Sequence, residues 1–332
     1  MSGARLPLGG TAQSAKGAPV SGYVDVHHHF NAPGGRGGQA TWTPDRAVDE
    51  MDEAGVQLAI GWPGPVAVGE VQEGRKRARF INDFGAGVVQ LHPARFGLFA
   101  SLPPLHDTEG ALAEIEHACG TLKADGVGIV THYGERFLGH ADFAPVWEEL
   151  DRRSAVVFVH PQGPGGRCAC GQQGYQHGDI SDAWLEYPFN TARTILSLVS
   201  TGTRRRYPRI RFIFCHGGGA LTPLIGRIEG FTGWFDMGEE RLRTMFPDGL
   251  LAEFAQLHFE CAQAFAPDYM GMLRQLVPDS QILFGTDYDR FPLTHSAERL
   301  RALRLPPATE RAIASGNARR LLGRSDEQGT LP

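Results

Sequence analysis

The chain has 332 residues, 42% of them hydrophobic, which is enough for one large α/β barrel or for two ordinary domains. Its formal net charge of −5 is mild and the sequence has no basic stripe, so nucleic acid is not expected as a partner. No stretch approaches the roughly 20 apolar residues of a membrane span, and no membrane association is expected.

The chain begins with a segment rich in Gly, Ala and Ser, residues 1–20, that lacks the apolar centre of a secretory signal. This composition favours a flexible tail on a cytoplasmic protein. The five cysteines form no framework of even pairs, as expected in a reducing compartment. We expect one barrel domain over 21–324 and a C-terminal tail over 325–332.

Short apolar runs rich in β-branched and aromatic residues recur along the chain and are typical of buried parallel strands. In chain order they are YVDVHH (23–28), VQLAIGW (56–62), FGLFASL (96–102), GVGIVTHY (126–133), AVVFVHP (155–161), IRFIFCHGG (210–218), LHFECAQ (257–263) and ILFGTDYD (282–289). Capped helical patterns lie between them, for example at 43–55, 107–120 and 142–154. This alternation predicts a (β/α)8 TIM barrel. The competing doubly wound sheet lacks a G-x-G-x-x-G after the first strand.

Two connections are long, 162–209 and 217–256, and both leave the C-terminal face of the predicted barrel, where active sites form. Residues 161–179 are too many and too polar for a mere connector, so we expect a lid or substrate loop there. Cys168, Cys170 and His177 lie in this loop but lack a further well-spaced pair, and we do not expect them to bind a second metal.

Polar side chains stand at the C-terminal ends of several predicted strands. His27 and His29 are two positions apart on the first strand, so both point to one face and His28 points to the other. Three more strands, the fifth, sixth and eighth, end in His160, His216 and Asp287. These side chains converge on one mouth, and three or four imidazoles with one carboxylate suit a divalent ion such as zinc, manganese or iron.

Each histidine also has a structural interpretation, because a lone histidine is commonly a hydrogen-bonded core or surface residue. His92 precedes the third strand and His258 starts the seventh, which assigns both to the opposite end of the barrel. His132 ends the fourth predicted strand, where a contact with substrate and a structural hydrogen bond remain open. Asp25 is expected to orient a ligand histidine or to satisfy the barrel interior rather than to bind metal.

Four motifs in this order, DVHHHF, FVHP, FCHGGG and LFGTDY, resemble the metal-dependent amidohydrolase superfamily. More narrowly, they are similar to its aminocarboxymuconate-semialdehyde decarboxylase branch, which includes γ-resorcylate, 5-carboxyvanillate and 6-methylsalicylate decarboxylases. Two longer segments, 126–161 and 187–219, look most like the 6-methylsalicylate decarboxylases. The resemblance extends from about residue 23 to about residue 322.

The resemblance implies one divalent metal ion per subunit, with zinc the first choice and manganese the second. The ligands that it implies are His27, His29, His160 and Asp287. His216 would be the acid/base, and Arg227 would match an arginine that reaches a neighbouring subunit to hold the substrate carboxylate, which requires at least a homodimer. The metal-bridging lysine of dinuclear relatives has no counterpart at the end of strand four, which reads VTHY.

Three departures from the family pattern lie around the expected substrate rather than at the metal. The eighth strand reads GTDYDRFP, which adds Asp289 and Arg290, the seventh reads FECAQ, and the fourth carries His132. We therefore assign His132 and Arg290 to substrate binding. The resemblance adds Arg227 to the substrate residues and implies His216 and Asp287 as the catalytic ones.

The expected activity is a non-oxidative decarboxylase that acts on a small aromatic (ortho-hydroxybenzoate-like) or unsaturated carboxylic acid. Two alternatives stay open on the sequence. The same ligands would serve a hydrolase or hydratase that uses a metal-activated water. A barrel that has lost catalysis and serves as a scaffold is disfavoured by the intact ligand set.

Overall fold

Eight parallel strands form the centre of the computed structural model, which describes residues 22–33, 42–67, 69–163, 180–234 and 239–324. In spatial order they are β1 (Tyr23–His29), β2 (Val56–Trp62), β3 (Phe96–Ser101), β4 (Gly126–Val130), β7 (Val156–His160), β8 (Arg211–Phe214), β9 (His258–Glu260) and β10 (Ile282–Leu283). Seven of these strands lie within the predicted runs, and β1 extends one residue past its run, to His29. The (β/α)8 barrel is confirmed.

The barrel closes where the first strand meets the segment that begins at β10. The backbone N–H of Val26 donates to the carbonyl of Phe284 over 3.1 Å, and that of Asp287 donates to the carbonyl of His27 over 2.8 Å. A parallel bridge joins His28 to Tyr288. This closing seam therefore runs through the residues that the sequence assigned to the metal.

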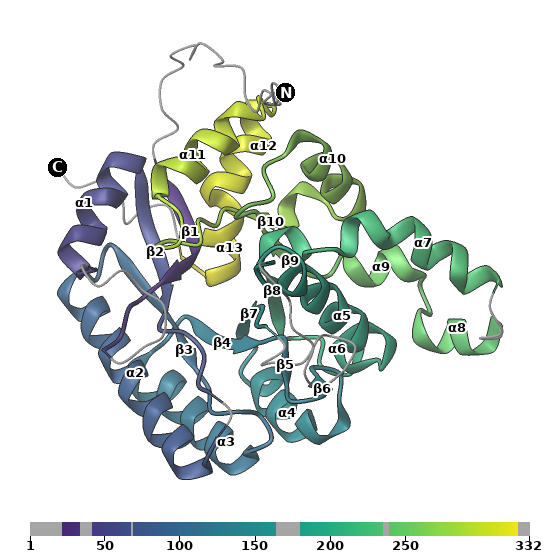
Figure 1. Cartoon of the computed structure of the whole chain (residues 1–332), viewed down its shortest axis with the longest axis horizontal. Coiled ribbons are helices and arrows are strands. Elements are labelled where there is room, and N and C mark those ends of the chain that lie inside the picture. The colour runs from purple at the N-terminus through teal and green to yellow at the C-terminus, as the bar shows by residue number, and fades with distance from the viewer. Residues whose placement is uncertain (1–21, 34–41, 68, 164–179, 235–238, 325–332) are drawn as a thin grey trace, which may run out of the picture.

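Thirteen α-helices are described between and after the strands, and most of them surround the strands in Figure 1. They are α1 (Pro44–Ala54), α2 (Val71–Leu91), α3 (Thr108–Glu116), α4 (Ala144–Arg152), α5 (Glu186–Ser200), α6 (Thr203–Arg206), α7 (Leu221–Trp234), α8 (Glu239–Met245), α9 (Leu250–Phe254), α10 (Pro267–Leu276), α11 (Leu293–Ala302), α12 (Pro307–Arg311) and α13 (Asn317–Leu322). The helices α7 and α8 extend to one side, away from the barrel (Figure 1).

The ends of the first helices follow from capping. The hydroxyl of Thr43 accepts the N–H of Arg46, and Gly55 ends α1 with a left-handed φ of 77°. Asp107 accepts the N–H of Gly110 at the start of α3. The predicted helix 107–120 runs on from α3 into a π-helical turn, His117–Leu122.

Aromatic side chains from alternate strands fill the barrel interior below the mouth. Phe99 of β3 stacks on Phe158 of β7 with ring centroids 5.4 Å apart, and both are fully buried. The ring of Phe158 also contacts that of His27, 5.1 Å away. Burying each ring stabilises the fold by about 1.5–3 kcal/mol, and the packed layer supports the mouth from below.

The fourth strand differs from its prediction. It ends at Val130, and His132 lies instead in β5 (His132–Tyr133), which pairs antiparallel with β6 (Arg136–Phe137). The physical reason is the turn that follows, where Gly134 adopts a φ of 64° and reverses the chain. The prediction that His132 ends the barrel strand is therefore wrong.

Some predictions fall largely outside the described residues: the two tails, and the loop 161–179 with Cys168, Cys170 and His177 beyond residue 163. In the described part of the chain, no helix has the length and apolar character needed to cross a membrane.

Candidate metal centre

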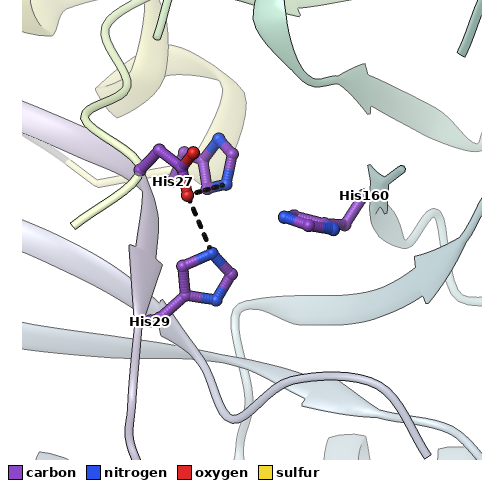
Figure 2. Close-up of side chains that lie close together, drawn as sticks. His27, His29 and His160 are labelled. Atoms are coloured by element: carbon purple, nitrogen blue, oxygen red, sulfur yellow. Dashed lines mark hydrogen bonds and ion pairs between the residues drawn. The ribbon is translucent and has the colours of Figure 1, made fainter. Parts of the chain in front are cut away.

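Four residues from three parts of the barrel meet at its C-terminal mouth. His27 and His29 come from β1, His160 ends β7, and Asp287 follows β10. One ligand atom of each lies within 4.8 Å of the ligand atoms of the other three. Figure 2 shows the imidazoles of the three histidines around one shared space. The strand ends that sequence reasoning selected are thus brought together.

The carboxylate of Asp287 lies among the imidazoles. Its Oδ1 is 3.3 Å from Nε2 of His27 and 3.1 Å from Nε2 of His29, and its Oδ2 is 3.5 Å from Nε2 of His216. His216 is therefore also at the mouth, with its ring centroid 5.1 Å from that of His27.

Two of these residues have strained backbones. His216 has a φ of 54° and Asp287 a φ of 58°, in the left-handed region that costs a non-glycine residue about 1–3 kcal/mol. Such strain persists where the surrounding structure fixes it, and it is common at functional sites. Here it aims both side chains into the cluster.

The donor set fits a divalent ion. Nε2 of His27 is buried, has no hydrogen-bond partner among the described residues and lies 3.3 Å from Oδ1 of Asp287, which is unfavourable unless a proton or a metal ion lies between the two atoms. Nδ1 of His160 lies 2.6 Å from the carbonyl of Pro161, which it can only reach as a donor, so Nε2 remains a free ligand. Three imidazoles and a carboxylate are the ligands of zinc and of manganese.

Burial and charge shift the titration of the cluster strongly. Burial, together with the neighbouring imidazoles of His29 and His27, holds the pKa of His160 well below 6.5. Burial alone would raise the pKa of Asp287, but the surrounding imidazoles, His27 first, hold it well below 3.8. A neutral imidazole and an ionised carboxylate are the forms that bind metal.

The other two polar residues of β1 serve the fold. The ring of His28 stacks on Tyr288 at 4.6 Å and its Nδ1 lies 3.2 Å from Asp25, so it points away from the cluster as predicted. Asp25 accepts the backbone N–H of His27 and two bonds from Thr286, which fixes the backbone beside the ligands. Asp25 orients the site and is not a member of the metal-ligand group.

The predicted substrate residues come from three different segments: the hairpin of β5 and β6, the loop after β10, and α7. His132 is buried in its hairpin with Nδ1 3.1 Å from the hydroxyl of Thr131, and burial lowers its pKa to about 4. Arg290 is exposed beside Asp287, whose carbonyl accepts its N–H. Arg227 is exposed on α7, a helix that extends to one side of the barrel in Figure 1.

Sequence reasoning missed Glu260, which ends β9 and is fully buried beside the cluster. Its Oε1 is 2.9 Å from Nδ1 of His27. A signal was present in the run LHFECAQ, because a carboxylate at the end of an otherwise apolar barrel strand points to the mouth.

The chain is similar to known proteins over nearly its whole length. A family model described as amidohydrolase matches residues 24–324. The 6-methylsalicylic acid decarboxylase of Penicillium expansum is 32% identical over 326 residues, which cover 91% of this chain and 96% of that protein.

Solved structures share the fold at lower identity. A 2,6-dihydroxybenzoate decarboxylase in complex with 2,6-dihydroxybenzoate has a TM-score of 0.78 at 23% identity, covering 92% of this chain and all of that one. A dihydroxybenzoic acid decarboxylase from Polaromonas sp., with bound manganese and the inhibitor 2-nitroresorcinol, has a TM-score of 0.77 at 23% identity and covers 93% and 100%. The comparisons favour the decarboxylase interpretation of the site over the hydrolase one.

Proposed function

The chain belongs to the amidohydrolase family, and we propose that within it the protein is a metal-dependent non-oxidative decarboxylase of a 6-methylsalicylate-like ortho-hydroxybenzoate. The observation that carries this proposal is the four-residue ligand cluster at the mouth of a barrel aligned over nearly its whole length with a decarboxylase.

The cofactor in this proposal is one divalent ion per subunit, held by His27, His29, His160 and Asp287. Zinc is the first candidate for this ligand set. Manganese is the second, and the similar Polaromonas structure contains it. When bound, the ion would act as a Lewis acid toward the oxygens of the substrate carboxylate and its neighbouring hydroxyl.

His216 is the proton donor in this proposal. The imidazoles around Asp287, His27 first, hold the pKa of that carboxyl well below 3.8, so Asp287 is a poor acid. The imidazole of His216, 3.5 Å from this carboxylate, is the remaining candidate at the mouth. His216 gives its proton to the ring carbon that bears the carboxylate. The bond between the two carbons breaks, its electron pair restores the aromatic ring, and CO2 leaves.

The substrate residues and the assembly complete the proposal. Arg227, exposed on the extending helix α7, would hold the carboxylate in the site of a second copy, so the active form is a homodimer or a higher homo-oligomer. Arg290 and His132 would contact the substrate from the side of the mouth. We assign the protein to the cytoplasm, with residues 21–324 as its one catalytic domain between two tails.

A screen of the metal-loaded protein against ortho-hydroxy aromatic acids, with 6-methylsalicylate first, tests the function. We expect CO2 release and a product that has lost the carboxyl group. If none of these acids is decarboxylated and an ester, amide or lactone is instead hydrolysed with addition of water, the protein is a hydrolase.

A further inference from the structure

Glu260 is a fully buried carboxylate whose partners lie in the proposed metal centre and in the proposed acid/base. Its Oε1 is 2.9 Å from Nδ1 of His27 and accepts the backbone N–H of His216 over 2.6 Å. Its Oε2 accepts the backbone N–H of Ala262 over 2.6 Å. Both oxygens of the Glu260 carboxylate therefore already have hydrogen-bond partners inside the barrel.

From these contacts we propose that Glu260 is a positioning residue that orients His27 toward the metal ion and couples it to His216. A carboxylate only accepts hydrogen bonds, so the proton of the neutral His27 ring is on Nδ1. Nε2 then carries the lone pair, and this is the buried atom that has no hydrogen-bond partner among the described residues and faces Asp287. Metal-binding histidines are commonly oriented by such an outer carboxylate.

The same carboxylate fixes His216. The backbone of that residue has a φ of 54°, and its N–H is anchored by Glu260. Loss of the anchor removes one of the contacts that hold the strained conformation. Glu260 therefore fixes both the ring of the metal ligand His27 and the backbone of the proton donor His216, although it touches neither the substrate nor the ion.

A second metal ion between His27, His216 and Glu260 is the competing explanation, because atoms of these three residues also lie within 4.8 Å of one another. The hydrogen bonds favour positioning. Two backbone N–H groups and one imidazole already point at the two carboxylate oxygens, and a cation there would face these donors.

Gly285 gives an independent observation on the same side chain. A Cβ built on Gly285 would lie 2.0 Å from Oε2 of Glu260 and 2.8 Å from its Cδ, and it would also lie 3.0 Å from Cβ of His27. The carboxylate thus occupies the space over this glycine at the closing seam. The Gly285→Ala variant would displace the carboxylate without removing it.

The experiment measures manganese affinity and stoichiometry by titration of the chelator-treated protein, and the visible absorption spectrum after loading with cobalt. The proposed role of Glu260 rests on the proposed metal centre, so the wild-type protein is measured first. Failure of wild type to bind an ion would overturn the proposed function. Normal binding by wild type and by the Glu260 variants alike would overturn only the role of Glu260.

We expect Glu260→Ala to weaken manganese binding by about 10- to 100-fold and to change the cobalt spectrum. Glu260→Gln keeps an oxygen for Nδ1 of His27 and should recover much of the affinity. The matched control is Glu114→Ala, which removes another buried carboxylate, one that bonds Asn82 and Arg79, and should leave metal binding unchanged.

If Glu260→Ala fails to fold, Gly285→Ala carries the test, and wild-type affinity in that variant would overturn the proposal. If it folds, the part of the Gly285→Ala effect that acts through the carboxylate should disappear in the Glu260→Ala background, and only the part due to the close contact with Cβ of His27 should remain. Two ions per wild-type subunit, one of them lost in Glu260→Ala, would overturn the positioning role in favour of a second metal site.

Discussion

His216 illustrates how one residue can combine a reactive side chain with an unusual backbone. Its imidazole lies 3.5 Å from Asp287, while its φ of 54° belongs to a conformation that asparagine adopts more readily than most other residues. Asparagine is therefore the substitution that removes the proton donor and preserves the turn.

We expect His216→Asn to lower kcat by about 10²- to 10⁴-fold, the usual contribution of a general acid. The bound metal, measured by elemental analysis after dialysis, should stay at the wild-type level, because His216 is outside the proposed ligand set. Wild-type kcat in this variant would assign the proton to another group.

Asp287 provides the contrasting case, because the proposal makes it a ligand. Asp287→Asn should lose most of the bound metal, and its activity should fall by roughly 100-fold or more. This loss exceeds the loss of about 10- to 100-fold in metal affinity or activity that is expected when a residue that only orients a ligand is changed. Elemental analysis measures the metal content, and a decarboxylation assay measures the activity of the same sample. Full metal content in the variant would remove Asp287 from the ligand set.

His258, at the N-terminal end of β9, should make the stability of the fold depend on pH, because its side chain is largely buried. Burial lowers its pKa to about 4, whereas the unfolded chain has the ordinary value of 6.5. Between these values the unfolded state binds the extra proton, so the free energy of unfolding falls as the pH falls, by about 2 kcal/mol at pH 5.

His258→Gln should therefore lose less stability than wild type when the pH is lowered from 7 to 5. Chemical denaturation at both pH values gives the difference. Equal losses in the two proteins would show that His258 does not titrate as its burial indicates.

At the scale of elements, the eight strands could be predicted because a buried parallel strand is apolar on both faces and leaves a continuous run in the sequence. The ligand strand ends followed from the barrel rule that polar C-terminal ends face the site. The hairpin of His132 could not be foreseen from the run GVGIVTHY, because the run continues past the strand and only Gly134 marks the turn. One partner of Glu260, His27, lies 233 residues away in the sequence, and only the closed barrel brings the two together.

The helix α7 is the element that the proposed dimer depends on. Arg227→Ala should lower kcat/KM by about 10- to 100-fold, since a hydrogen bond to a charged group contributes about 1.5–3 kcal/mol, with metal content unchanged. Mixing this variant with Asp287→Asn should restore about a quarter of wild-type activity if the arginine acts across a two-fold dimer, since half of the dimers then hold one complete site. No recovery on mixing, with both variants dimeric, would place Arg227 in its own subunit's site or in none.

At the scale of the whole molecule, metal binding should stabilise the fold, because the ligands come from both ends of the chain. Manganese at 100 times its dissociation constant should add about 2.7 kcal/mol to the free energy of unfolding and raise the Tm by several degrees. A chelator should reverse the shift, and Asp287→Asn should show none. An equal shift in that variant would indicate binding elsewhere.

The closing seam has a consequence for how the protein is made. During synthesis the histidines of β1 emerge first, and their carboxylate partner, 258 residues further on at Asp287, is among the last parts of the barrel to appear. A nascent or truncated chain that stops between residues 160 and 284 contains the three ligand histidines but neither the fourth ligand nor the bonds that close the barrel. Tight binding of metal would thus distinguish chains that include Asp287 from every fragment that ends before it, and the ion would join the two ends of the barrel only after both have been synthesised.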